Sequence, residues 1–211
     1  MHTTGTGLET CPGSTVMPLD VDASSVESEI ILHTQVLLKN DRIYRHRLMR
    51  INYTAYDVRR MQDSINPNTD HRDVILLSDT PTSTAHPFCY ARVLSIFHAN
   101  VIYNGPALTD YQPRRLEFLW VHWFEVIESH QEQNAYKLDV LRFVPMHEDD
   151  AFGFIDPADV LRSCHLIPDF SKGKLHPDCQ AMSRASRDAN DSKQYYVNRF
   201  VFWSTIELVG G

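Results

Sequence analysis

Four aromatic residues in the middle of the sequence offer the most specific chemistry that the residue types allow. They are Tyr90, Trp120, Trp123 and Phe124. Three rings that converge at an exposed rim can bind a methylated ammonium group by cation–π attraction. Trp120 and Trp123 differ in parity, however, so one straight strand cannot direct both at the same ligand. The spacing favours core packing of these rings and leaves a binding cage as the alternative.

Cysteine and histidine residues supply candidates for a metal site and for a nucleophile. The donor types that zinc prefers are present in Cys164, His165, His176 and Cys179. Adjacent residues point to opposite faces of a strand, so this spacing is poor for zinc and we expect no cofactor. Cys89 lies near His86, but no Gly-rich turn or helix start precedes it. We therefore expect Cys89 to be a core thiol rather than a nucleophile.

Charged residues are unevenly distributed along the chain. Residues 39–60 hold seven Lys or Arg against two Asp, whereas residues 125–159 hold nine acids against two basic residues. The arginines that could form one phosphate-binding face are Arg45, Arg47, Arg59, Arg60, Arg114 and Arg115. The net charge of −7 argues against a general nucleic-acid coat. A solvated basic strand is the favoured interpretation, and local binding of nucleic acid is the alternative.

Length and composition limit the kind of protein that can position these residues. The chain has 211 residues, of which 43% are hydrophobic and 22% charged, and this excludes wholesale disorder, collagen and coiled coil. Four cysteines are too few for a disulfide scaffold. The beginning of the sequence does not resemble a signal peptide, and residues 116–127 are shorter than a membrane helix of ~20 residues. We expect one intracellular domain without a membrane partner.

Short apolar runs between turn residues predict a mainly β protein. The alternation over residues 90–103, with Val93 and Phe97 on one parity, predicts a strand with one covered face. Residues 116–127 are apolar on both parities, which predicts a strand covered on both faces, with a buried helix as the alternative. Residues 74–77 and 195–202 add further strands. The expected fold is a small β-barrel or partly open sheet with short helices.

Local signals predict the turns and the short helices. Asn40-Asp41 favours a hairpin between residues 30–39 and 42–49, and the segment 66–70 favours a turn. Thr54 as a cap predicts a helix over residues 54–63. Asp156 as N-cap before Pro157 predicts one or two helical turns over residues 157–163, followed by a strand at 165–167.

Polarity predicts where the domain begins and ends. Residues 1–28 are rich in Thr, Ser, Gly and Pro and predict a disordered tail. The domain is expected over residues 29–203, with a long, exposed, flexible loop at 171–193 and a tail at 204–211.

Three segments in this order resemble a bromo-adjacent homology (BAH) domain. They are Tyr90-Ala91-Arg92-Val93-Leu94-Ser95-Ile96-Phe97, then Glu117-Phe118-Leu119-Trp120-Val121-His122-Trp123-Phe124, then Phe152-Gly153-Phe154-Ile155-Asp156 through Cys164-His165-Leu166. The resemblance covers roughly residues 73–168. It implies a β-barrel module used for chromatin or protein contacts and not for catalysis.

A longer part of the chain is similar to the C-terminal region of proteins encoded by mushroom-type fungal transposons of the Plavaka-like group. The similarity runs from Asn52 to Val201 and is carried by His86-Pro87-Phe88, Pro113-Arg114-Arg115 and Asp156-Pro157-Ala158-Asp159-Val160-Leu161. It departs after Val201, where such regions continue with charged residues. A transposase core is not part of the resemblance, so DNA cleavage is not implied.

Together these observations predict a non-catalytic interaction domain of a transposon-derived protein. Its expected partner is a protein or chromatin, and a nuclear location is favoured over a cytoplasmic one. A nucleic-acid-binding accessory module is the first alternative, and a zinc- or thiol-dependent enzyme is the second. The oligomeric state does not follow from the sequence.

Overall fold

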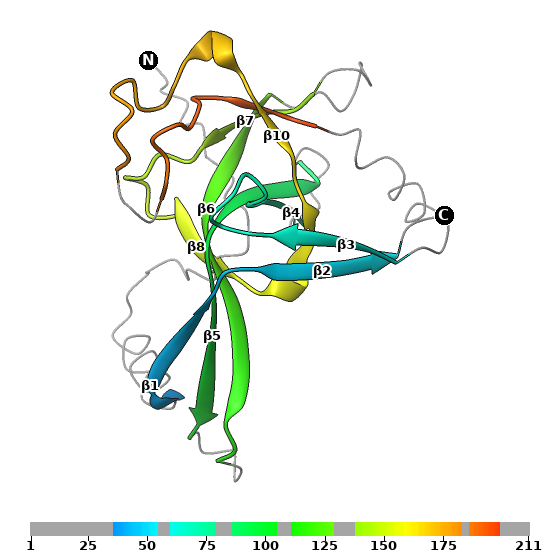
Figure 1. Ribbon diagram of the computed structural model, residues 1–211, viewed down its shortest axis with the longest axis vertical. Helices are drawn as coiled ribbons and strands as arrows, with labels where there is room; N and C mark the ends of the chain where they lie inside the picture. The colour runs from blue at the N-terminus through cyan, green and yellow to red at the C-terminus, as the bar shows by residue number, and fades with distance from the viewer. Residues whose placement is uncertain are drawn as a thin grey trace, which may run out of the picture.

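Two long neighbouring strands form the spine of the fold (Figure 1). The computed structural model describes residues 36–54, 60–78, 86–104, 111–128, 138–182 and 186–198. In it, β5 (Phe88–Tyr103) and β6 (Arg114–Glu128) pair antiparallel over most of their length. On the other edge of β5, β4 (Asp73–Leu77) and β1 (Val36–His46) follow one another. On the other edge of β6, β8 (Phe152–Ile155) and β7 (Val140–Phe143) do the same.

Shorter strands extend this spine into a strongly curled, partly open sheet of nine strands. At one end β9 (Val160–Ser163) joins β4, and at the other end β11 (Tyr195–Val197) joins β7 and carries β10 (Leu166–Pro168). A separate hairpin, formed by β2 (Met49–Thr54) and β3 (Arg60–Ile65), extends to the side (Figure 1). The mainly β fold expected from the sequence is confirmed, in the form of a half-barrel.

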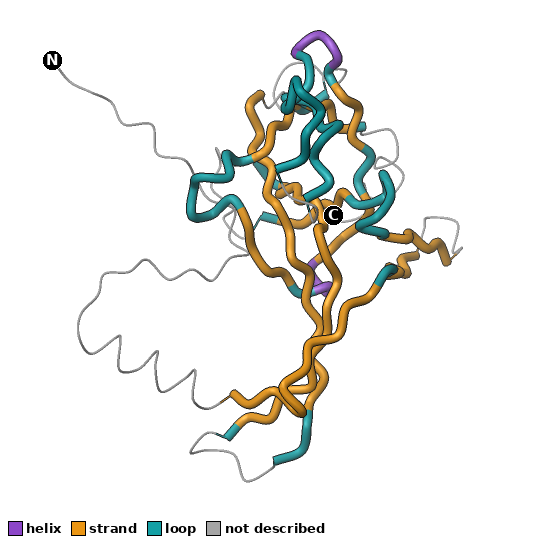
Figure 2. The backbone as a smooth tube through the Cα atoms, turned by 60° about the vertical axis from the view of Figure 1, so that its left-hand side comes forward, coloured by secondary structure: helices purple, strands orange, loops and turns teal. Residues whose placement is uncertain are grey.

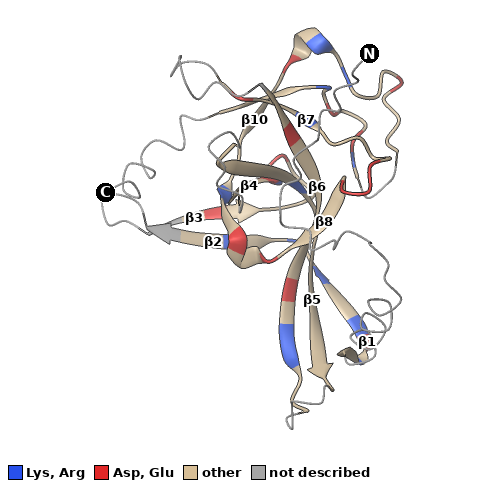
Figure 3. Ribbon diagram, turned by 180° about the vertical axis from the view of Figure 1, so that it is seen from behind, with Lys and Arg blue, Asp and Glu red and all other residues tan. Residues whose placement is uncertain are grey.

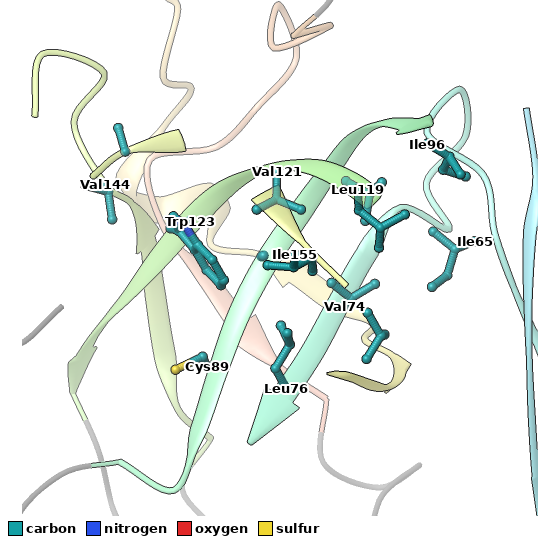
Figure 4. Packing of buried hydrophobic residues seen from close by; sticks show 14 residues of the cluster. Ile65, Val74, Leu76, Cys89, Ile96, Leu119, Val121, Trp123, Val144 and Ile155 are labelled. Atoms are coloured by element: carbon teal, nitrogen blue, oxygen red, sulfur yellow. The ribbon is translucent and has the colours of Figure 1, made fainter. Parts of the chain in front are cut away.

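The central residues of the spine are buried on both faces of the sheet, and their apolar side chains belong to two clusters. One cluster includes Leu119, Val121 and Trp123 of β6, packed with Val74 and Ile155 (Figure 4). The other cluster includes Phe124 from the same strand. The strand predicted at residues 116–127, covered on both faces, is therefore confirmed for its central part, and the helical alternative is wrong.

A β-bulge at Leu94 changes which residues of β5 share a face. Val93 is opposite Val121, but the next pair is Ser95 with Trp120, so Leu94 is an extra residue. Val93 consequently lies in the core, whereas Phe97 contacts Phe118 on the other side of the sheet. The expectation that Val93 and Phe97 share a covered face was wrong, because a strict period of two holds only in the absence of a bulge.

The turn predicted at Asn40-Asp41 does not connect two paired strands. Both residues have positive φ, 60° and 51°, as a tight turn requires. The residues before and after them both pair with β5, with Leu38 opposite Val101 and Ile43 opposite Ala99. The feature is therefore a four-residue bulge within one strand, with residues 39–42 opposite Asn100 of β5.

The predicted helices are shorter or missing. Thr54 belongs to β2 and residues 60–63 to β3, which contradicts a helix over 54–63; residues 55–59 lie outside the described part. Strand pairing overrides the local helical spacing here. Asp156 does cap a helix by accepting from the Ala158 amide at 2.8 Å, but only a 3-10 turn forms at Pro157–Asp159 before β9 begins. A second 3-10 turn covers Phe170–Lys172.

The remaining local predictions hold in part. The turn at residues 66–70 is present, with the Thr69 amide donating to the Asn66 carbonyl at 3.0 Å. The segment 171–193 is not uniformly exposed, because Ser186, Asp188 and Asp191 are buried. The tails predicted at 1–28 and 204–211 lie outside the described residues.

The outer ends of three strands form an arm that projects from the rest of the protein (Figures 1 and 2). We use this name for β1, residues 96–103 of β5 and residues 114–118 of β6, which pair side by side. The arm is a three-stranded sheet, and its two faces differ in chemistry, as described below.

Candidate functional site

The four aromatic residues predicted as a group do not converge on one ligand. Trp123 packs in one core cluster, and Tyr90 and Phe124 pack in the other. Trp120 is half-buried, with its ring centroid 6.1 Å from that of Phe152. Three of the four rings are therefore core residues, as the favoured interpretation expected.

An aromatic enclosure exists nearby, and a cation of the chain itself occupies it. The Arg92 guanidinium carbon lies 5.5, 4.8 and 5.4 Å from the ring centroids of Phe124, Phe143 and Tyr195. These distances are in the range of cation–π attraction. A methylated ammonium group could enter only by displacing Arg92. Phe143 and Tyr195 were missed at the sequence level because they come from distant strands.

Two buried carboxylates hold Arg92 in this enclosure. Its Nε and Nη2 atoms donate to Asp73 at 2.7 and 3.1 Å, and Nη1 donates to Asp191 at 2.5 Å. Burial alone would lower the pKa of Arg92, but the charges of Asp73 and Asp191 raise it above its ordinary value. Arg92 is thus permanently charged and fixed, and it joins β5 to β4 and to the segment 171–193.

The residues considered for zinc or thiol chemistry do not form one group, because some are buried in the core and others contact neighbouring side chains. Cys89 is in the core, and burial, together with the charge of Asp73, raises the pKa of the Cys164 thiol well above its ordinary value. His165 and Cys179 are exposed, and Cys179 Sγ lies 3.3 Å from Lys174 Nζ. His176 Nε2 contacts Asp188 at 3.0 Å. Among the described residues, no three His, Cys, Asp or Glu side chains gather as metal ligands would.

A histidine–aspartate pair was missed by the sequence analysis. His86 Nε2 lies 3.1 Å from Asp139 Oδ2, and the Tyr90 hydroxyl donates to the same oxygen at 3.4 Å. Asp139 is fully buried, and 53 residues separate it from His86. Nothing local in the sequence marks such a pair. Cys89 packs in a different core cluster from Tyr90, so it does not complete a nucleophilic site with this pair.

The six candidate arginines do not form one face. Strand register puts Arg45 and Arg114 on one face of the arm, since Arg45 is opposite Phe97 and Arg114 is opposite Val101. Arg115 lies on the other face, with its Nε 2.7 Å from Glu117 Oε1. Arg47 is exposed just beyond β1. The side chains of Arg59 and Arg60 lie outside the described part of the structure.

One face of the arm is apolar and partly exposed. Residues opposite one another in a sheet share a face, so register assigns Ile43, Ala99 and Leu116 to one row of this face. We call it the apolar face; its apolar members on the arm are Val36, Leu38, Ile43, Phe97, Ala99, Val101, Tyr103, Leu116 and Phe118. Exposed fractions are 47% for Val36, 38% for Leu38, 54% for Ile43 and 50% for Leu116. The apolar face therefore leaves several large apolar side chains at the surface of one sheet.

Aromatic rings continue the apolar face toward the body of the protein. The Phe118 ring lies 5.5 Å from Phe97 and 5.6 Å from Phe154, which is 60% exposed. Phe154 is opposite Trp120, so the rings lie on the same side of the sheet. The alternation over residues 90–103 predicts that this apolar side is covered, whereas Phe97, Val101 and Tyr103 are only partly buried.

The opposite face of the arm is polar and internally paired. His98 stacks on Tyr44 at a centroid distance of 4.7 Å, and His46 Nε2 lies 2.5 Å from His98 Nδ1. Arg115 and Glu117 add an ion pair to this face. Leu37 and Ile102 are its apolar members at the tip. The two faces thus give neighbouring residues of one strand different surroundings.

Charge along the arm is mainly basic. Figure 3 shows Lys and Arg on β1 and on the outer end of β6. Lys39 and Arg42 lie in the bulge of β1, next to Asp41. The acidic run Glu148-Asp149-Asp150 lies in turns between β7 and β8, away from the register positions of the arm.

Neither 3-10 turn in the described residues is long or apolar enough to cross a membrane. Comparison with protein-family models, with curated proteins and with solved structures finds no match to this chain. The candidate site therefore rests on the geometry of the described residues, and the apolar face of the arm is its strongest element.

Proposed function

We propose that this chain is a non-catalytic interaction module that docks to a protein partner through the apolar face of its arm. The single observation that supports this most is that half-exposed Leu38, Ile43 and Leu116 lie on the same face of a projecting sheet. Exposed contiguous apolar surface is typical of protein interaction sites. The chemistry that the resemblance to BAH domains implies, chromatin or protein contact in the nucleus, agrees with this proposal.

The placement of the polar groups supports a binding role over catalysis. Arg92, Asp73 and Asp191 are engaged with one another, and Cys89 is part of the core. These groups stabilise the body of the protein, on which the arm is carried. The proposal assigns the function to the arm and the structural role to the body.

Adjacent leucines on opposite faces of β1 allow a direct test. Leu38 is on the apolar face and Leu37 on the polar face, at 38% and 50% exposure. A photo-crosslinking phenylalanine analogue placed at residue 38 or at residue 37 should distinguish the faces in cells. We expect specific protein adducts at residue 38 and at residue 116, but not at residue 37. A purified, identified partner should then lose affinity at least tenfold for Leu38→Ser and keep it for Leu37→Ser.

Nucleic acid is the second candidate partner, favoured by Lys39 and Arg42 in the bulge of β1 and by Arg114. It predicts nuclease-sensitive adducts at residues 38 and 116 and a binding constant that falls steeply between ~50 and ~200 mM salt. That outcome, or adducts distributed equally over both faces, would contradict docking of a protein to the apolar face.

A further inference from the structure

Among the described arm residues whose face the strand register assigns, the apolar face carries charges of only one sign. Its charged members are Arg45 and Arg114, which register places on this face. No described carboxylate forms an ion pair with either guanidinium. The arm's own carboxylate on β6, Glu117, is on the polar face and pairs with Arg115. Within the described part of the chain, the apolar face therefore combines apolar side chains with two guanidinium groups that have no carboxylate partner there.

The two arginines lie at opposite corners of this face. Arg45 is in the row of Phe97 and Phe118 on the outer strand β1, and Arg114 is in the row of Leu38 and Val101 on β6. These positions are two strands and four residues apart, which corresponds to about 17 Å between the Cα atoms. Ile43, Ala99 and Leu116 fill the row between them. Any partner that covers the apolar side chains must pass between two cations.

We propose, building on the function above, that the partner is a protein segment with an apolar stretch and a carboxylate at each end, matched to Arg45 and Arg114. Carboxylates facing the arginines would gain charge-assisted hydrogen bonds in a region partly shielded from water. The apolar stretch would cover Ile43 and Leu116. The apolar contact strengthens the ion pairs, because covering the apolar residues removes water from around both guanidinium groups.

Charge also argues against a second copy of this chain as the occupant. In a two-fold contact between apolar faces, the same two arginines of both copies enter one interface, which then holds four positive charges. Like charges brought together in an interface are costly. A nucleic acid would satisfy the arginines but would leave Leu38, Ile43 and Leu116 without an apolar contact.

The experiment uses the full chain and three labelled peptides that differ only in their end charges. Each peptide has alternating valine and serine flanked by glutamate, glutamine or lysine, and binding is measured by fluorescence anisotropy. We expect the glutamate peptide to bind at least tenfold more tightly than the glutamine peptide, and the lysine peptide not to bind. The double variant Arg45→Glu/Arg114→Glu should reverse this order and bind the lysine peptide.

The chain provides a matched control for the charge reversal. Arg115→Glu makes the same change one residue away, on the polar face, and should leave the preference for the glutamate peptide unchanged. Leu38→Ser should weaken both the glutamate and the glutamine peptide, whereas Leu37→Ser should weaken neither. Retained circular dichroism of each variant ensures that loss of binding is not loss of fold.

Each remaining outcome would overturn the inference in a distinguishable way. Equal binding of glutamate and glutamine peptides, lost in Leu38→Ser, would refute the acidic partner but keep protein docking. A dimer in sedimentation that Ile43→Ser abolishes would assign the apolar face to a second copy. Salt-sensitive binding of duplex DNA, lost in Arg45→Glu/Arg114→Glu, would refute both this inference and the proposed function. Absence of binding by all three peptides would refute the inference, with the crosslinking experiment deciding the function.

Discussion

At the scale of single residues, Arg92 is the side chain whose removal should cost most. Its guanidinium forms ion pairs with both Asp73 and Asp191, and all three groups are buried; Arg72, 3.4 Å from Asp191, supplies the second positive charge. Removing one partner leaves uncompensated buried charge. We expect Arg92→Met to lower the free energy of unfolding by about 3–5 kcal/mol, measured by urea denaturation.

A matched variant separates this effect from arginine loss in general. Arg142 pairs with Glu125 on the surface, with 52% of its side chain exposed. Arg142→Met should therefore cost under about 1 kcal/mol. If both variants lost equal stability, the buried pairs would not have the role assigned to them.

His122 should make stability depend on pH. Its ring stacks between Phe143 and Phe152, each at 4.5 Å, and its Nε2 donates to the Val144 carbonyl at 2.8 Å. Burial lowers the pKa of His122 below its ordinary value of about 6.5. The unfolded chain then binds a proton that the folded chain does not, so stability falls as pH decreases below about 6.5.

The measurement compares thermal unfolding at pH 7.5 and 5.5. We expect the decrease in melting temperature at the lower pH to be smaller in His122→Phe than in the wild type, because phenylalanine keeps the stacking but does not titrate. An unchanged pH dependence in the variant would show that other groups cause it.

At the scale of elements, Gly153 sets how closely β8 approaches the core. A Cβ atom at this position would lie 2.7 Å from Trp123 Nε1, below any normal contact. Gly153→Ala must therefore displace the indole or the strand, and we expect a loss of about 1–3 kcal/mol. The indole N–H resonance of Trp123 in an NMR spectrum should shift in the same variant.

Gly173→Ala is the control for this prediction, because any loss of stability at this position arises from backbone strain and not from a close contact. Its φ is +81°, and no atom lies within 4 Å of a Cβ there. It should cost about 1 kcal/mol through backbone strain and leave the Trp123 resonance in place. A Trp123 shift in both variants would argue against the close approach of β8.

The elements also show what local sequence can and cannot predict. The apolar runs at 74–77 and 116–127 and the cap at Asp156 act through neighbours in sequence, and they were predicted. The helix at 54–63 was wrong because tertiary pairing of β2 with β3 outweighs local spacing.

The candidate site was less accessible to sequence reasoning. The enclosure around Arg92 joins Phe124 to Tyr195, and its ion pair joins Arg92 to Asp191, 99 residues away. The apolar face depends on the relative register of three strands, which no single segment encodes. Residue types were identified correctly, but their grouping required the fold.

At the scale of the whole molecule, body and arm should differ in local stability. The inner half of β5 is buried on both faces, whereas the arm has one exposed apolar face and one solvated polar face. Local opening costs less where few apolar contacts are lost. Hydrogen exchange measured by mass spectrometry should therefore be faster for residues 98–103 than for residues 90–94.

A partner that covers the apolar face should change this pattern. Exchange in residues 98–103 should slow on binding of the glutamate peptide, while residues 90–94 remain unchanged. Equal protection of both halves in the free protein would contradict a separate, more easily opened arm.

The extra residue at Leu94 has a consequence for the entire molecule, since it acts as a phase shift. Odd-numbered residues of β5 point inward at Cys89, Ala91 and Val93, yet the same numbering points to the opposite side at Phe97, Ala99 and Val101. The alternating small and apolar side chains of β5 therefore line the core at one end of the strand and form the apolar face at the other end. Without that extra residue, Phe97, Ala99 and Val101 would lie on the side of the sheet that carries His46.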